Sequence, residues 1–198
     1  LWLLSVTIVT LSFLIFRSEN FMTLIASLIG VTALIFVAKG DVLGQILTIV
    51  FSLLYSLISF GFAYYGEMIT YMGMTAPIAL LSVITWLKNP YSKKQVKIRT
   101  LNAKQYILLF IVSLIVTWVF YYILAFFNTT NIVFSTISVT TSFLASALMM
   151  LRDPHYALAY AANDLVLIVL WVMATMENIS YVSMIACFSI FFINSRNL

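Results

Sequence analysis

The feature that most constrains this chain is a series of apolar stretches, each nearly as long as a bilayer's hydrocarbon core is thick. A membrane-spanning helix needs about 20 mostly apolar residues. Eight segments reach or approach this length: 1–16, 21–38, 42–65, 68–86, 106–127, 132–151, 156–176 and 179–193. Barrel strands need only about 10 residues, so these segments are too long for them. We therefore predict an all-α, polytopic membrane protein.

Composition excludes most other classes of protein. Hydrophobic residues make up 64% of the chain and charged residues 8%, whereas a soluble domain is roughly half apolar and a quarter charged. The basic residues that raise the pI to about 9.2 are too few for a nucleic-acid surface. With one cysteine, Cys187, and one histidine, His155, neither a disulfide framework nor a Cys/His metal site is expected. No phosphate loop or nucleophile–His–acid set occurs, so we expect no enzyme activity and no cofactor.

The chain opens at Leu1 inside an apolar run, without an initiator Met. No cleavage site of small residues follows this run, so we interpret 1–16 as an extra N-terminal transmembrane helix rather than a signal peptide.

Charge predicts the orientation in the membrane. Cytoplasmic loops accumulate Lys and Arg, and segment 87–105 holds six of the ten basic residues without an acid. Placing that loop inside also places Lys39, Arg152 and Arg196 inside, and leaves Arg17 as the exception. Glu19, Glu67 and Glu177 then fall outside. We predict a multi-pass protein of the bacterial cytoplasmic membrane with a cytoplasmic C-terminus and a basic loop that contacts anionic lipid.

A weak internal repeat predicts the arrangement of the helices. A shift of 113 residues lays 21–44 over 134–157 and matches Lys39 to Arg152. The repeat divides the chain into an N-terminal helix (1–20), a three-helix unit (21–86), the basic loop (87–105), a connecting helix (106–127) and a second three-helix unit (128–198). With one connecting helix both units enter from the same side, so they are parallel repeats, typical of a transporter with a site near the midplane.

A buried acid is the strongest candidate for binding chemistry. Asp164 lies nine positions into its segment, or ~13 Å deep at ~1.5 Å per residue, near the bilayer centre. A charged Asp there costs roughly 2.5–3.5 kcal/mol on insertion scales, so it should face the protein interior or a wet cavity. Helical spacing places it on one stripe with three aromatic residues, an amide and a leucine: Tyr156, Tyr160, Trp171, Asn163 and Leu167.

A structural cluster that holds helices together would explain this stripe. We favour a ligand site, because no Lys or Arg at hydrocarbon depth pairs with the acid. Its partner is then a proton, a water or a cationic ligand. Further candidates are Gln45, Thr48 and Tyr55 on the corresponding helix of the first unit and Trp118 on the connecting helix, while Pro77 is expected to kink segment 68–86.

Segments 38–90 and 140–171 resemble the two halves of the PnuC-type vitamin transporters, which are distantly similar to the SWEET sugar transporters. Features in the familiar order are Ala38–Gly40, Tyr55, Gly66–Glu67, Pro77, Trp86 and the polar–aromatic helix around Asp164. The resemblance implies a three-plus-one-plus-three fold, a homotrimer, and facilitated uptake of nicotinamide riboside that is trapped inside by phosphorylation.

The resemblance also implies a binding pattern. At positions 160, 164 and 171 the family has Trp, Asn and Trp, whereas this chain has Tyr160, Asp164 and Trp171. Phe51, which the 113-residue shift pairs with Asp164, stands where many relatives place a second Asn in the first repeat. A pyridinium cation suits the acid and the aromatic rings, and ribose hydroxyls suit Asn163 and Asp164 as acceptors.

Several alternatives stay open. Thiamine is the second candidate because it is also cationic; riboflavin and deoxynucleosides are carried by relatives, and a sugar would gain little from a buried acid. Transport coupled to protons through Asp164 is a further alternative to simple facilitation. A membrane-embedded enzyme or a non-transporting subunit is the alternative of another class.

Overall fold

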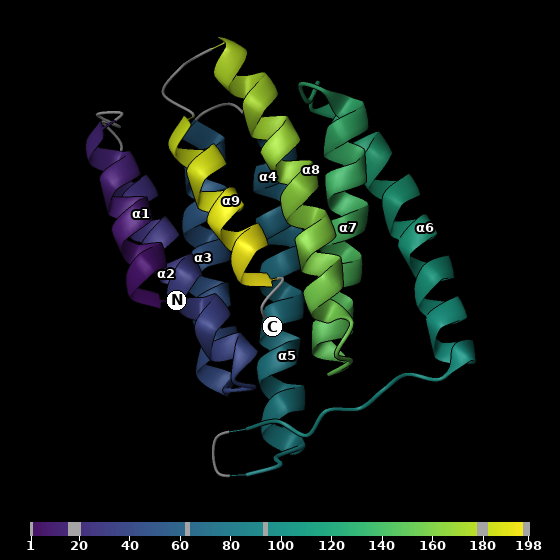
Figure 1. The fold of residues 1–198 in the computed structure, drawn as a ribbon. Coiled ribbons are helices and arrows are strands. Elements are labelled where there is room, and N and C mark those ends of the chain that lie inside the picture. Colours follow the sequence, from purple (N-terminus) through teal and green to yellow (C-terminus); the bar gives the residue numbers. More distant parts are fainter. Residues whose placement is uncertain (1, 16–20, 62–63, 93–94, 178–181, 196–198) are drawn as a thin grey trace.

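The computed structural model describes residues 2–15, 21–61, 64–92, 95–177 and 182–195 (Figure 1). Within these ranges the regular structure is helical, and the extended segments form only two isolated β-bridges, Asp41 to Gln95 and Pro90 to Val96. The helices are α1 (Trp2–Ile15), α2 (Phe21–Ala38), α3 (Val42–Gly61), α4 (Tyr65–Thr70), η1 (Tyr71–Thr75), α5 (Ala76–Lys88), α6 (Ala103–Phe126), α7 (Ile132–Met150), α8 (Tyr156–Glu177) and α9 (Val182–Ser195).

Six helical spans in the described residues are long and apolar enough to cross a membrane. They are Phe21–Ala38, Val42–Gly61, Tyr65–Lys88, Ala103–Phe126, Ile132–Met150 and Tyr156–Met176. The terminal helices α1 and α9 are apolar but have 14 residues each. The prediction of an all-helical membrane protein is confirmed at this level. Residues 1, 16–20, 178–181 and 196–198, which include Arg17, Glu19, Ile179 and Arg196, lie outside the described residues.

Six elements form a closed ring, in which each packs against its two neighbours in the order α2, α3, α5, α7, α8 and α9, and α9 returns to α2. Helix α6 lies outside this ring and packs mainly on α7, while α1 lies outside it against α2 and α9 (Figure 1). Most of α6 is therefore exposed, as expected of a helix that faces lipid.

Small hydroxyl residues allow the ring helices to approach closely. Buried serines recur every three or four positions on the inner face of α7, at Ser135, Ser138, Ser142 and Ser146, and on α3, at Ser52, Ser56 and Ser59. In a membrane, helices associate through such close packing and through hydrogen bonds, because lipid tails compete for apolar contacts. These two seams bring α3 and α7 to opposite sides of one central space.

The kink expected at Pro77 takes the form of a π-helical turn, η1, directly before it. Proline lacks an N–H and its ring clashes with the preceding turn, so the helix widens locally. The hydroxyl of Thr75 donates to the Thr70 carbonyl five residues earlier (3.4 Å). Such turns frequently occur at functional sites, and this one directs Tyr71 and Thr75 into the centre of the ring.

The turns at the ends of α2 and α7 have the same geometry. Gly40 and Arg152 both adopt a left-handed backbone (φ 68° and 65°). The carboxylates of Asp41 and Asp153 each accept the N–H two residues later, at Leu43 and His155 (both 2.9 Å). The loop before α6 donates Val96 N–H to the Gly40 carbonyl and Arg99 N–H to the Arg152 carbonyl. These turns correspond at an offset of 112 residues, not the 113 that matching Lys39 with Arg152 predicted.

Asp153 fixes the start of α6 to the second of these turns. Its buried carboxylate accepts four hydrogen bonds, from Leu101 N–H (2.8 Å), the Tyr106 hydroxyl (2.8 Å), and the His155 N–H (2.9 Å) and Nδ1 (2.8 Å). Burial alone would raise the pKa of Asp153, but the hydrogen bonds outweigh it and hold the pKa below its ordinary value.

Candidate substrate-binding site

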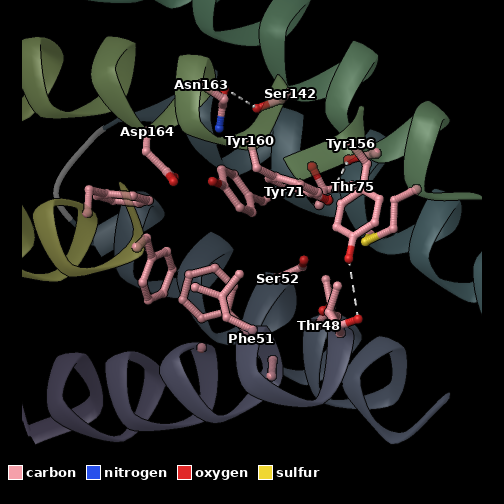
Figure 2. Close-up of a pocket in the computed structure, with 18 residues that line it drawn as sticks. Thr48, Phe51, Ser52, Tyr71, Thr75, Ser142, Tyr156, Tyr160, Asn163 and Asp164 are labelled. Atoms are coloured by element: carbon pink, nitrogen blue, oxygen red, sulfur yellow. Dashed lines mark hydrogen bonds between the residues drawn. The ribbon is translucent and has the colours of Figure 1, made fainter. Parts of the chain in front are cut away.

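A cavity of about 50 Å³ lies at the centre of the ring. Figure 2 shows Tyr160, Asn163, Asp164 and Ser142 facing it from α7 and α8, and Thr48, Phe51 and Ser52 facing it from α3. The remaining walls come from Gly30, Ala33, Leu34 and Val37 of α2, Tyr71 and Thr75 of η1, Ser146 and Met149 of α7, Tyr156 of α8, and Phe188 and Phe191 of α9. Every helix of the ring except α5 contributes a side chain to the cavity wall. At the position of α5, the π-turn η1 that precedes it supplies the wall through Tyr71 and Thr75.

The walls of the cavity repeat along the chain. Thr48, Phe51 and Ser52 of α3 recur 112 positions later as Tyr160, Asn163 and Asp164 of α8. Gly30, Leu34 and Val37 of α2 recur at the same offset as Ser142, Ser146 and Met149 of α7. The counterpart of Asp164 is therefore Ser52, and the counterpart of Asn163 is Phe51. The pairing of Phe51 with Asp164 that the sequence predicted is off by one residue.

The amide of Asn163 has a defined orientation. Asn163 is 2% exposed, and its Oδ1 accepts the hydroxyl protons of Thr141 (2.8 Å) and Ser142 (2.9 Å) from α7. Because Oδ1 is held by these two donors, the amide nitrogen is the end that faces the cavity (Figure 2). Asn163 thus presents a hydrogen-bond donor to the cavity and not the acceptor for ribose hydroxyls that we predicted from the resemblance.

Asp164 supplies the acceptor beside this donor. It is 3% exposed and lines the cavity one residue further along α8. Among the described residues that line the cavity there is no Lys or Arg. A carboxylate at this depth is costly unless its surroundings or a ligand stabilise the charge, and a carboxylate that lines a cavity is able to accept hydrogen bonds from a ligand there.

Trp171 and Tyr55 support the cavity from behind its wall. Both are buried and neither lines the cavity. The indole N–H of Trp171 donates to the Tyr55 hydroxyl (2.9 Å), and the Tyr55 ring lies 4.3 Å from that of Tyr71, which does line it. The structure therefore places Trp171 where it positions Tyr71 through Tyr55, rather than where it would stack directly on a ligand.

The other candidates divide in the same way. Tyr156, Tyr160, Thr48 and Phe51 line the cavity. Gln45 is fully buried near the start of α3, outside the lining, and its amide has no hydrogen-bond partner among the described residues. Trp118 is 64% exposed on α6, away from the ring, so the structure does not bring it to this site.

Several lining residues escaped sequence reasoning. Tyr71 and Thr75 enter through a π-turn, which hydropathy does not reveal. Phe188 and Phe191 are indistinguishable in sequence from other apolar residues of a membrane helix. Ser142 carried a usable signal, since it belongs to the serine seam of α7. Among the described residues no group of His, Cys, Asp and Glu has the geometry of a metal site.

Comparison with known proteins gives consistent results. Residues 20–197 match the family model described as "Nicotinamide mononucleotide transporter". A curated relative, the nicotinamide riboside transporter PnuC of Neisseria mucosa, is 24% identical over 182 residues, which cover 89% of this chain and 69% of the relative. A solved structure described as "Crystal structure of the Vitamin B3 transporter PnuC" has a TM-score of 0.78 and 22% identity, covering 99% of this chain and 88% of the other.

Proposed function

Because the chain belongs to the nicotinamide mononucleotide transporter family, we propose that it carries nicotinamide riboside across the membrane through the central cavity. The resemblance predicted from the sequence is confirmed, and the family consists of transporters rather than enzymes. The curated relative is named for nicotinamide riboside, and that substrate is assigned to this chain on the chemistry of the cavity.

The observation that carries the proposal is the pair formed by Asn163 and Asp164. With its Oδ1 occupied by Thr141 and Ser142, Asn163 has its amide nitrogen available to donate to a ligand, and the carboxylate of Asp164, which also lines the cavity, is able to accept. The carboxamide of nicotinamide is complementary, because its carbonyl accepts and its NH₂ donates. Nicotinic acid riboside has the same shape but ends in a carboxylate, which offers no donor and would be repelled by Asp164.

Charge supports the same substrate. The pyridinium ring of nicotinamide riboside is a permanent cation, and it would lie near Asp164 and the rings of Tyr71, Tyr160 and Phe51. Cation–π attraction contributes ~1–2 kcal/mol at a desolvated site. Thiamine is the second candidate, because its permanent cation is also matched by Asp164. Neutral riboflavin and sugars bring no positive charge to the carboxylate of Asp164.

Transport requires the cavity to widen. Its volume of about 50 Å³ holds a few water molecules, whereas pockets for ligands of this class are ~300–1,000 Å³. We propose that the two halves of the ring separate alternately toward each side, so that the substrate moves down its gradient without ATP. Phosphorylation by a separate kinase then traps it inside. Proton coupling through Asp164 is tested by whether an imposed pH gradient accelerates uptake.

We further propose that the two halves are parallel three-helix repeats, 21–86 and 128–198, with 1–20 as an extra N-terminal transmembrane helix, 87–105 as a cytoplasmic loop and 106–127 as a connecting helix. The matching turns and cavity walls at an offset of 112 residues support this division. The basic loop supports a cytoplasmic C-terminus in the bacterial inner membrane. The exposed apolar face of α6 suits a homotrimer, in which it would be shared between subunits.

Calorimetric titration of the purified protein tests the substrate. The panel is nicotinamide riboside, nicotinic acid riboside, thiamine, riboflavin and a deoxynucleoside. We expect nicotinamide riboside to bind most tightly and nicotinic acid riboside to bind at least ~10-fold more weakly, since loss of one buried hydrogen bond and addition of a like charge cost ~1.4 kcal/mol or more. Equal affinity for the two ribosides would show that Asn163 and Asp164 do not distinguish the carboxamide from a carboxylate.

A further inference from the structure

A second, wider cavity of about 580 Å³ opens at the end of the ring formed by the α2–α3 and α7–α8 turns. We call it the basic vestibule, because Lys39, Lys97 and Arg152 line it. It shares Val37 and Tyr156 with the central cavity, and the Tyr156 hydroxyl donates to the Val37 carbonyl (3.4 Å) between them. A solute that leaves the central cavity at this end therefore passes Tyr156 and enters the vestibule.

The three bases come from different parts of the chain and face the vestibule without matching acids. Among the described residues the one ion pair joins His155 and Asp153. The carboxylate of Asp153 is buried and committed to four hydrogen bonds, and it does not line the vestibule. Asp41, next to the lining residue Gly40, uses its Oδ1 to accept the Leu43 N–H (2.9 Å). The lining residues therefore include three basic side chains and no acidic one.

Hydrogen bonds to the backbone hold the Arg152 side chain and the loop that carries Lys97. The guanidinium of Arg152 donates to the Lys97 carbonyl (3.1 Å), and the loop that carries Lys97 is fixed to both turns by Val96 and Arg99. Burial and then the nearby Arg99 lower the pKa of Arg152. An anion bound here would relieve that repulsion, and a concave surface of one charge concentrates its field.

We propose that the basic vestibule binds a phosphate monoester, through Lys39, Lys97 and Arg152. The cavity volume lies in the range of pockets for nucleotide-sized ligands, and Lys and Arg are the side chains that proteins use for phosphate. One source is the phosphorylated form of the carried nucleoside, nicotinamide mononucleotide; the other is a lipid headgroup. The first source rests on the proposed function. Bound behind Tyr156, the nucleotide would obstruct release of nicotinamide riboside, so product would slow further uptake.

The test compares variants of equal charge. Lys39→Gln/Lys97→Gln removes two vestibule charges, and Lys88→Gln/Lys104→Gln removes two exposed charges that do not line it. Detergent-purified protein is titrated with nicotinamide mononucleotide and with inorganic phosphate, and then with vesicles of neutral lipid containing or lacking phosphatidic acid. Nicotinamide riboside is titrated in the same preparations.

We expect saturable binding of a phosphate monoester that weakens about tenfold in the vestibule variant, weakens with added salt and stays unchanged in the control. Binding of soluble nucleotide identifies the product as the source, and binding confined to phosphatidic acid vesicles identifies the lipid. If none of these probes binds, or if the control variant loses affinity as much as the vestibule variant does, the proposal is wrong. Failure of nicotinamide riboside to bind, with phosphate binding intact, overturns the proposed substrate and leaves the vestibule standing.

Discussion

Replacing Asn163 with leucine tests whether its amide nitrogen donates a hydrogen bond to the carboxamide of the ligand. Leucine has nearly the same size but removes the amide nitrogen that faces the cavity. A carboxamide bound there would keep its carbonyl buried without a donor, which costs ~1–3 kcal/mol. The Kd for nicotinamide riboside should therefore rise about 5- to 150-fold.

The fold should tolerate this change. The Thr141 hydroxyl, which loses Asn163 as an acceptor, also lies 3.0 Å from the Ile137 carbonyl of its own helix, so the main loss is the hydrogen bond from the Ser142 hydroxyl. Asn194→Leu is the matched control, because Asn194 is equally buried, donates to Ser5 (3.1 Å) and does not line the cavity. We expect the control to lower thermal stability comparably and to leave binding unchanged.

The decisive assay is a cycle with a second ligand, pyridinium riboside, which lacks the carboxamide. Wild type should prefer nicotinamide riboside over this analogue by ~1 kcal/mol or more, and Asn163→Leu should bind both with nearly equal affinity. Calorimetry on the four pairs gives the coupling free energy. If Asn163→Leu weakens both ligands by the same factor, the amide does not contact the carboxamide and the reasoning is wrong.

Three other predictions follow from the structure. Asp164→Ala should weaken nicotinamide riboside by at least ~10-fold in calorimetry while the protein still folds, since a hydrogen bond to a charged group contributes ~1.5–3 kcal/mol; unchanged affinity would remove Asp164 from the site. Gly44→Ala should lower the midpoint of thermal unfolding, because a Cβ there would meet the Val37 backbone nitrogen at 2.4 Å. The control Gly73→Ala, with open space around it, should leave the midpoint unchanged. Equal midpoints for the two variants would contradict the close approach of α2 and α3 at Gly44. The hydrogen-bonded carboxylate of Asp153 has a lowered pKa. Its contribution to the stability of the folded protein is therefore complete above the unfolded pKa of ~3.9 and is lost as the pH falls through the lower folded pKa. The free energy of unfolding, measured from pH 7 to 3, should show this loss in wild type and not in Asp153→Asn.

The spans and Asp164 were predictable because each rests on a one-dimensional signal. Hydropathy over about 20 residues identifies a membrane helix without knowledge of its neighbours, and α2 has the bounds expected from it. The cost of burying a charge identifies Asp164 as a residue that faces the interior. Both arguments hold wherever the helix lies in the bundle.

What could not be predicted depends on backbone conformation and on depth within the bundle. Their shared positive charge matched Lys39 with Arg152 in the sequence. In the structure it is Gly40, not Lys39, that has the same left-handed backbone conformation as Arg152, so the offset of the repeat differs by one residue. Helical spacing placed Trp171 on the face of Asp164 and did not show that Tyr55 and Tyr71 lie between it and the cavity. Trp118 belongs to a helix that is apolar on all sides, so its sequence does not distinguish lipid from a cavity.

Uptake of labelled nicotinamide riboside into vesicles that contain only the purified protein tests the central claim most directly. With no ATP, kinase or ion gradient present, we predict saturable uptake that stops at equal concentrations on both sides and that Asp164→Ala slows at least ~10-fold at substrate concentrations below the wild-type Kd. Uptake no faster than in protein-free vesicles, or uptake that Asp164→Ala leaves unchanged, would contradict the proposed transport through this cavity.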